Sequence, residues 1–116
     1  MFTIGIWDWG LVIGDWWLIK INFNKLEILD LSDNNITDIK ILEKVNFKEL
    51  KELYLNYNNI SDIKVLEKVK FEKLEELYLT GNEIDLAENN LIISKLKSLL
   101  KKLTIWIIKN NPLLFN

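Results

Sequence analysis

Hydrophobic and polar positions along the middle of the chain follow two alternating spacings. Leucines lie two residues apart, the side-chain period of an extended strand, in three pairs: Leu29 and Leu31, Leu53 and Leu55, Leu77 and Leu79. After each pair comes an asparagine, and in the first two cases the apolar spacing then becomes three, as at Ile36, Ile39, Leu42 and Val45. A spacing of three suits a helical or 3₁₀ segment packed on the same core. The pattern therefore predicts short strands that alternate with helical return segments.

This alternation repeats with a period of 24 residues. Residues 26–49 and 50–73 are identical at 14 of 24 positions, and a third copy opens as LEELYLTGNEI at Leu74 before it departs from the pattern. A fixed period of about 20–50 residues indicates stacked units, each of which contacts only its neighbours. We therefore interpret residues 26–49, 50–73 and 74–87 as repeats within a single domain that spans residues 1–116.

Residues 1–25 are predicted to form a degenerate N-terminal repeat. Moving the 24-residue frame back from Leu26 places apolar side chains at several core positions, whereas two glycines and an aspartate break the frame: Phe2, Trp7, Val12, Leu18, Ile21 and Phe23 against Gly5, Gly10 and Asp15. Large aromatic side chains can cover the outward edge of an end unit, which predicts a capping role for Trp7, Trp9, Trp16 and Trp17. The alternative interpretation is that this aromatic edge mediates self-association.

The C-terminal segment, residues 88–116, is predicted to contain a helix and a closing capping repeat. Leucines and isoleucines recur at helical spacing after Asp85, a candidate N-cap: Leu86, Ile93, Leu96, Leu100 and Leu103. The repeat pattern then returns at Leu103, Trp106, Ile108, Asn111 and Leu113, with Trp106 in a leucine position. An alternative register uses Leu100, Leu103 and Ile105.

Composition excludes several classes of function. Fifteen basic and 17 acidic residues leave a net charge of −2, which gives no field that favours nucleic acid or an anionic membrane. Without cysteine or histidine, the usual zinc sites and Ser-His or Cys-His catalytic pairs are not available, and we expect no metal and no cofactor. The absence of cysteine fits a reducing compartment, so we expect a cytoplasmic location.

The N-terminal apolar run raises the question of a signal peptide or membrane anchor. No basic residue precedes Lys20, and Asp8 and Asp15 interrupt the run. An acid at the centre of a spanning helix costs roughly 2.5–3.5 kcal/mol, so we expect neither a signal peptide nor a membrane-spanning segment.

The spacing LxxLxLxxNxI followed by xDIxxL resembles the leucine-rich repeat family, closest to its internalin-like and phosphatase-regulatory types. The resemblance implies an α/β fold: a right-handed solenoid with a short parallel sheet on the concave face and helical or 3₁₀ return segments outside. The repeat here is slightly longer than those two types usually show. Asn34, Asn58 and Asn82 form a column at the turn of each unit, where we expect their side chains to bond backbone groups that leave the strand.

The side chains between the leucines are the candidates for function. In a parallel sheet they form columns on the concave face, and we predict partner binding by Asp30, Glu52, Tyr54, Asn56, Tyr57, Glu76, Tyr78 and Thr80. Tyrosines beside carboxylates suit a protein or peptide of some basic character. The alternative interpretation is a fragment or remnant of a longer repeat array with a structural role and no partner of its own. We find no catalytic constellation and do not expect an enzyme.

Overall fold

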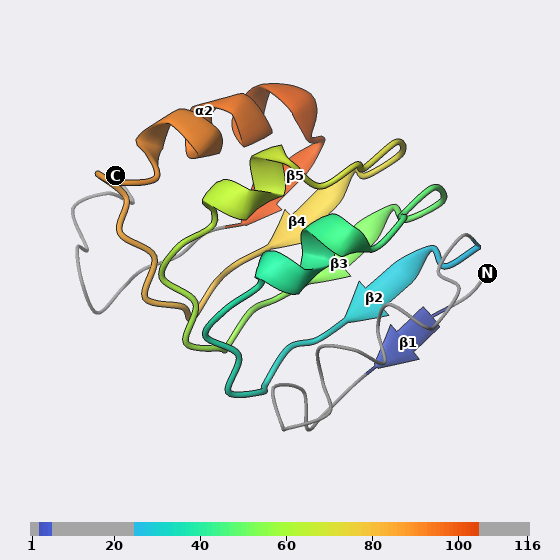
Figure 1. Cartoon of the computed structure of the whole chain (residues 1–116), viewed down its shortest axis with the longest axis horizontal. Coiled ribbons are helices and arrows are strands. Elements are labelled where there is room, and N and C mark those ends of the chain that lie inside the picture. Colours follow the sequence, from blue (N-terminus) through green and yellow to red (C-terminus); the bar gives the residue numbers. More distant parts are fainter. Residues whose placement is uncertain (1–2, 6–24, 105–116) are drawn as a thin grey trace.

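The computed structural model describes residues 3–5 and 25–104, which form one five-stranded parallel sheet in the order β1-β2-β3-β4-β5 (Figure 1). The strands are short: β1 Thr3–Gly5, β2 Ile28–Asp30, β3 Glu52–Tyr54, β4 Glu76–Tyr78 and β5 Lys102–Thr104. The connections carry the 3₁₀ helices η1 Lys40–Lys44 and η2 Lys64–Glu67 and the α-helix α2 Asn90–Leu99. Strands adjacent in sequence are adjacent in the sheet, and the helices lie along one side of it, so each repeat forms one coil of a solenoid.

The register of the central strands places the repeated leucines directly beside one another. Leu29 is the partner of Leu53, and Leu53 is the partner of Leu77. All three are 0% exposed, because this face of the sheet packs against the apolar side chains of the return segments. The other face of the sheet carries the residues between the leucines. We call this second face, which is turned away from η1, η2 and α2, the concave face.

The 3₁₀ helices begin where the repeated Asp-Ile-Lys sequence predicts a return path. Asp38 Oδ1 accepts a hydrogen bond from the backbone N–H of Lys40 at 2.9 Å, and Asp62 Oδ1 accepts one from Lys64 at 2.9 Å. Each aspartate thus satisfies a backbone donor that the start of a helix leaves without a partner. The predicted 3₁₀ character of the return segments is confirmed.

The C-terminal register that places Trp106 in a leucine position is wrong. Leu103 pairs with Leu77 in the sheet and therefore takes the position of the first strand leucine, as the alternative register predicts. The step from β4 to β5 is 26 residues, because this coil contains a full α-helix in place of a 3₁₀ turn. The remainder of the predicted capping repeat, residues 105–116, lies outside the described residues.

Helix α2 is shorter than its apolar spacing predicts, and Asp85 is not its N-cap. The helix begins at Asn90 after the N-cap Asn89, whereas Asp85 Oδ1 accepts a hydrogen bond from the Glu88 N–H in the preceding turn. Asn89 is 1% exposed. Its Oδ1 accepts from the Ile63 N–H at 3.1 Å and its Nδ2 donates to the Ser61 carbonyl at 3.1 Å. These bonds fix the helix to the second repeat.

At the N-terminal edge, Ile4 of β1 pairs with Leu29. The 24-residue frame places Gly5 at that position, so the frame is wrong by one residue here. The structure therefore places Ile4 and not Gly5 in register with the leucine column. The predictions for the tryptophans and for the aromatic edge fall outside the described residues.

Candidate functional site

In the asparagine column, the side chains of Asn58 and Asn82 form hydrogen bonds with backbone groups. Asn58 Oδ1 accepts from the N–H groups of Asn34 and Ile36 at 3.1 and 3.2 Å, and its Nδ2 donates to the carbonyls of Leu31 and Leu55 at 3.1 and 2.9 Å. Asn82 repeats this arrangement one coil later: its Oδ1 accepts from Ile60, and its Nδ2 donates to the carbonyls of Leu55 and Leu79. These side chains therefore hold neighbouring coils together and are not available to a partner.

Four side chains meet at the centre of the concave face. Glu52 of β3 is in register with Glu76 of β4, and Tyr54 is in register with Tyr78. The two tyrosine rings stack with 4.4 Å between their centroids and an angle of 1° between their planes. Because the two strands are one repeat apart, equivalent residues stand side by side, and the stacked pair of tyrosine rings lies next to two carboxylates.

Hydrogen bonds within this cluster fix the orientation of its side chains. The Tyr54 hydroxyl donates to Glu52 Oε1 at 2.6 Å, and the Tyr78 hydroxyl donates to Glu76 Oε1. A tyrosine hydroxyl that donates to a carboxylate is stabilised in its protonated form. Each carboxylate therefore raises the pKa of its tyrosine above the ordinary value, and burial raises it further. Both phenols therefore remain donors at neutral pH and hold the carboxylates in place.

Lys102 belongs to this cluster although the sequence prediction omitted it. It is in register with Glu76, and its ammonium nitrogen lies 5.3 Å from the centroid of the Tyr78 ring, which is cation–π distance. The omission follows from the wrong C-terminal register. The alternative register would have placed Lys102 in the column of Glu52 and Glu76.

The other predicted site residues lie around the cluster. Asp30 of β2 is in register with Tyr54, and its Oδ1 accepts hydrogen bonds from the backbone N–H and the hydroxyl of Ser32. Beyond the ends of β3 and β4, Asn56 Oδ1 and Thr80 Oγ1 are buried and have no hydrogen-bond partner. These three residues extend the cluster along the concave face.

Tyr57 stands apart from the other predicted site residues. It lies in the turn after β3 with a φ of 58°, at the repeat position that Asp33 and Gly81 also occupy with positive φ. Its side chain packs against the backbone of Gly81, where an added Cβ would lie 2.4 Å from Tyr57 Cδ1. Asp33 and Tyr57 show that other residues adopt this turn conformation, so the close approach of the Tyr57 ring is what requires glycine at position 81.

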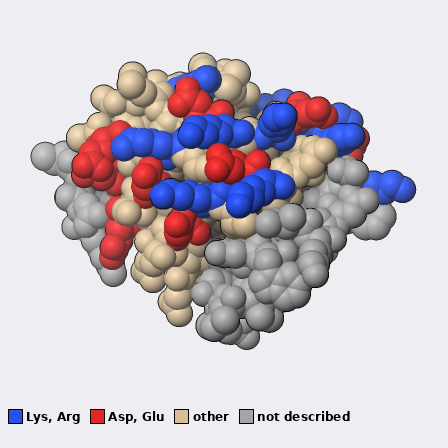
Figure 2. Space-filling model, viewed as in Figure 1, with Lys and Arg blue, Asp and Glu red and all other residues tan. Residues whose placement is uncertain are grey.

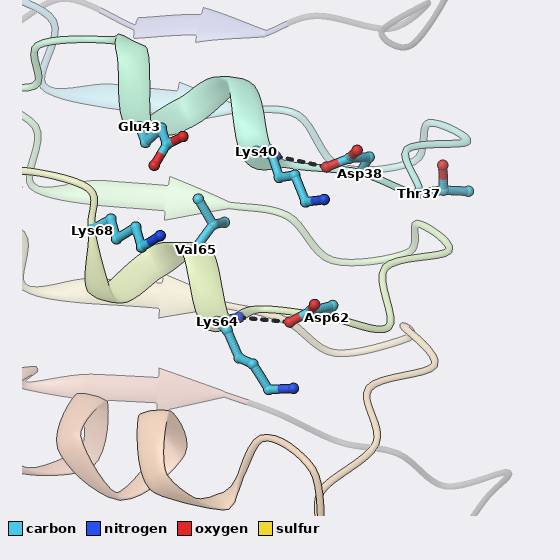
Figure 3. Close-up of a pocket in the computed structure, with 8 residues that line it drawn as sticks. All are labelled: Thr37, Asp38, Lys40, Glu43, Asp62, Lys64, Val65 and Lys68. Atoms are coloured by element: carbon cyan, nitrogen blue, oxygen red, sulfur yellow. Dashed lines mark hydrogen bonds between the residues drawn. The ribbon is translucent and has the colours of Figure 1, made fainter.

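On the opposite side of the solenoid, a groove of about 410 Å³ runs between η1 and η2 (Figure 3). Eight residues line it: Thr37, Asp38, Lys40, Glu43, Asp62, Lys64, Val65 and Lys68. Its three lysines and three carboxylates balance, and Figure 2 shows blue and red side chains interspersed across the centre of this side. A groove without net charge has no field to select a charged ligand, so the concave face is the stronger candidate.

Ion pairs on the surface join neighbouring coils and do not form a site. Lys73 pairs with Glu49 at 2.8 Å, and Lys95 pairs with Glu67 at 3.1 Å. These side chains are largely exposed to solvent, which screens the charges, so the pairs contribute little to stability. Within residues 3–5 and 25–104, no group of three or more acidic side chains is arranged to hold a metal ion.

The helices of the described ranges are all too short or too polar to cross a membrane.

Comparison with family models gives a match to the model described as Leucine Rich repeats (2 copies), once over residues 24–68 and again over residues 48–94. Together these matches cover more than half of the 116 residues. No curated protein matches the chain.

Proposed function

The chain belongs to the leucine-rich repeat family, and we propose that it binds a protein or peptide partner through the concave face of its sheet. Domains of this family generally mediate protein–protein interaction and are typically not enzymes. A binding role agrees with the concave face, where stacked tyrosine rings and fixed carboxylates lie on adjacent strands. The cytoplasmic location and the self-association expected from the sequence stay predictions.

The observation that carries this proposal is the fixed arrangement of Tyr54, Tyr78, Glu52 and Glu76. Association loses free energy when side chains become ordered, by about 0.5–1.5 kcal/mol for each flexible side chain. Here stacking and the two hydroxyl–carboxylate bonds order four side chains before any partner arrives. Tyrosines in such positions are also the residues that most often dominate binding energy at protein interfaces.

A pull-down from a cell extract tests the proposal, with wild type as bait against the double variant Tyr54→Ala, Tyr78→Ala. We expect the double variant to lose partners that the wild type retains, because it lacks both stacked tyrosine rings. The matched control is Lys40→Ala, Lys64→Ala in the groove between η1 and η2, which should recover the same partners as wild type. Equal recovery of every partner by all three baits, each confirmed as folded by circular dichroism, would contradict the proposal.

A further inference from the structure

We infer that the concave face recognises an arginine side chain on an extended partner segment, and that this side chain lies over β2 and β3 beside Asp30 and Glu52. This inference rests on the proposed function and names the chemistry of the partner. It follows from the uneven distribution of charge and of hydrogen-bond acceptors across the face.

Carboxylates on this face have a lysine as register neighbour at one end only. Glu52 and Glu76 stand directly opposite each other on neighbouring strands, and like charges in that position repel each other. Beyond Glu76 the next strand position is Lys102, whereas beyond Glu52 it is Ile28. Within residues 25–104, none of Asp30, Glu52 and Glu76 is within ion-pair distance of a lysine. The carboxylates without a lysine in register therefore lie over β2 and β3.

The aromatic stack offers a position for the guanidinium group of the partner's arginine. Lys102 already occupies the outer face of the Tyr78 ring, on the β5 side. The rings are parallel, so the outer face of Tyr54 is turned towards β2, where Ile28 and Asp30 are the register neighbours of Glu52 and Tyr54. An arginine fits this combination, because its aliphatic stem packs on isoleucine, its planar guanidinium stacks on tyrosine, and its N–H groups donate to carboxylates.

The remaining polar atoms of the face favour a partner that donates hydrogen bonds. The Tyr54 hydroxyl bonds Glu52 Oε1, so Oε2 of that carboxylate is left to accept. A partner that donates hydrogen bonds therefore fits this surface better than one rich in carboxylates.

Selection of random dodecapeptides displayed on phage against the immobilised full chain tests the inference. We expect the enriched peptides to share an arginine and to lose binding to the Tyr54→Ala, Tyr78→Ala variant. In a synthetic copy of the strongest peptide, replacing that arginine with glutamine should weaken binding about tenfold to a hundredfold, the loss typical of a charge-assisted hydrogen bond.

Single substitutions in the chain locate the arginine. Glu52→Gln should produce the same loss as the peptide change, and the two changes together should cost little more than either alone, because they remove the same contact. Glutamine still accepts from the Tyr54 hydroxyl, so the fold and the ring position are retained. Glu76→Gln should have a smaller effect because Glu76 already has Lys102 as its register neighbour, and Glu43→Gln in the groove between η1 and η2 should have none.

The outcomes separate this inference from the proposed function. Peptides that need Tyr54 and Tyr78 but contain no arginine, or that tolerate its replacement by glutamine, would overturn the arginine inference and leave concave-face binding in place. Failure to enrich any peptide, or equal binding of the enriched peptides to wild type and the double tyrosine variant, would overturn both.

Discussion

Replacing Asn58 with alanine is expected to lower the free energy of unfolding by about 3–5 kcal/mol, since each buried backbone group left without a partner costs about 1–3 kcal/mol. Asn58 is 5% exposed and lies between two coils. Its side chain accepts from Asn34 and Ile36 and donates to the carbonyls of Leu31 and Leu55. Alanine removes the acceptor of two backbone N–H groups, those of Asn34 and Ile36. The two carbonyls keep another donor, because Leu31 still accepts from Asn34 Nδ2 and Leu55 from Asn82 Nδ2. Two lost acceptors at about 1–3 kcal/mol each account for the expected loss.

The neighbouring Asn59 provides the matched control. Asn59 is exposed, and its contact with the previous coil runs through its backbone N–H to the Ile36 carbonyl at 2.9 Å, which substitution does not remove. Asn59→Ala should therefore change stability by no more than about 0.5 kcal/mol. Urea unfolding followed by circular dichroism measures both variants. Equal losses would contradict the assignment of the asparagine column to coil stacking.

Leu53→Ala is expected to lower the free energy of unfolding by about 3–5 kcal/mol, towards the upper end of values for leucine truncation in a core. Leu53 is 0% exposed and stands in register between Leu29 and Leu77, so the cavity is bounded on both sides by other coils. Neither neighbouring strand can move in to fill it without breaking its own backbone hydrogen bonds. The lost transfer energy and the cavity therefore add.

Leu91→Ala is the matched control for Leu53→Ala, because it removes the same side-chain atoms from a surface position. Leu91 lies in α2 and is 84% exposed. Alanine is the stronger helix former, so we expect a change within about 0.5 kcal/mol and in either direction. Thermal and urea unfolding of the two variants provide the comparison. Similar losses for Leu53→Ala and Leu91→Ala would contradict a core built from the strand leucines.

The family and the solenoid were predictable from the sequence because two neighbouring repeats have the same length. Equal lengths return Leu29, Leu53 and Leu77 to the same position after each coil. The same argument fails where a coil changes length. Helix α2 adds two residues to the step from β4 to β5, and apolar spacing alone does not distinguish Leu103 from Trp106 as the strand leucine.

For the candidate site, the positions of the residues were predictable from the sequence, whereas their side-chain contacts were not. Period alone places Glu52 beside Glu76 and Tyr54 beside Tyr78, since they hold equivalent positions in successive repeats. It gives neither the stacking of the rings nor the bonds between hydroxyls and carboxylates, because both depend on side-chain rotamers. Asn89 also escaped prediction, because it bonds the second repeat from a segment outside the repeating pattern.

Amide chemical-shift mapping shows directly whether a partner binds the concave face. The chain, labelled with nitrogen-15, would be titrated with the strongest dodecapeptide selected on the wild type. We predict that the largest shifts occur in β2, β3 and β4, with Tyr54 and Tyr78 among them, and that η1 and η2 change little. Shifts confined to the groove between η1 and η2, with β3 and β4 unaffected, would contradict binding at the concave face.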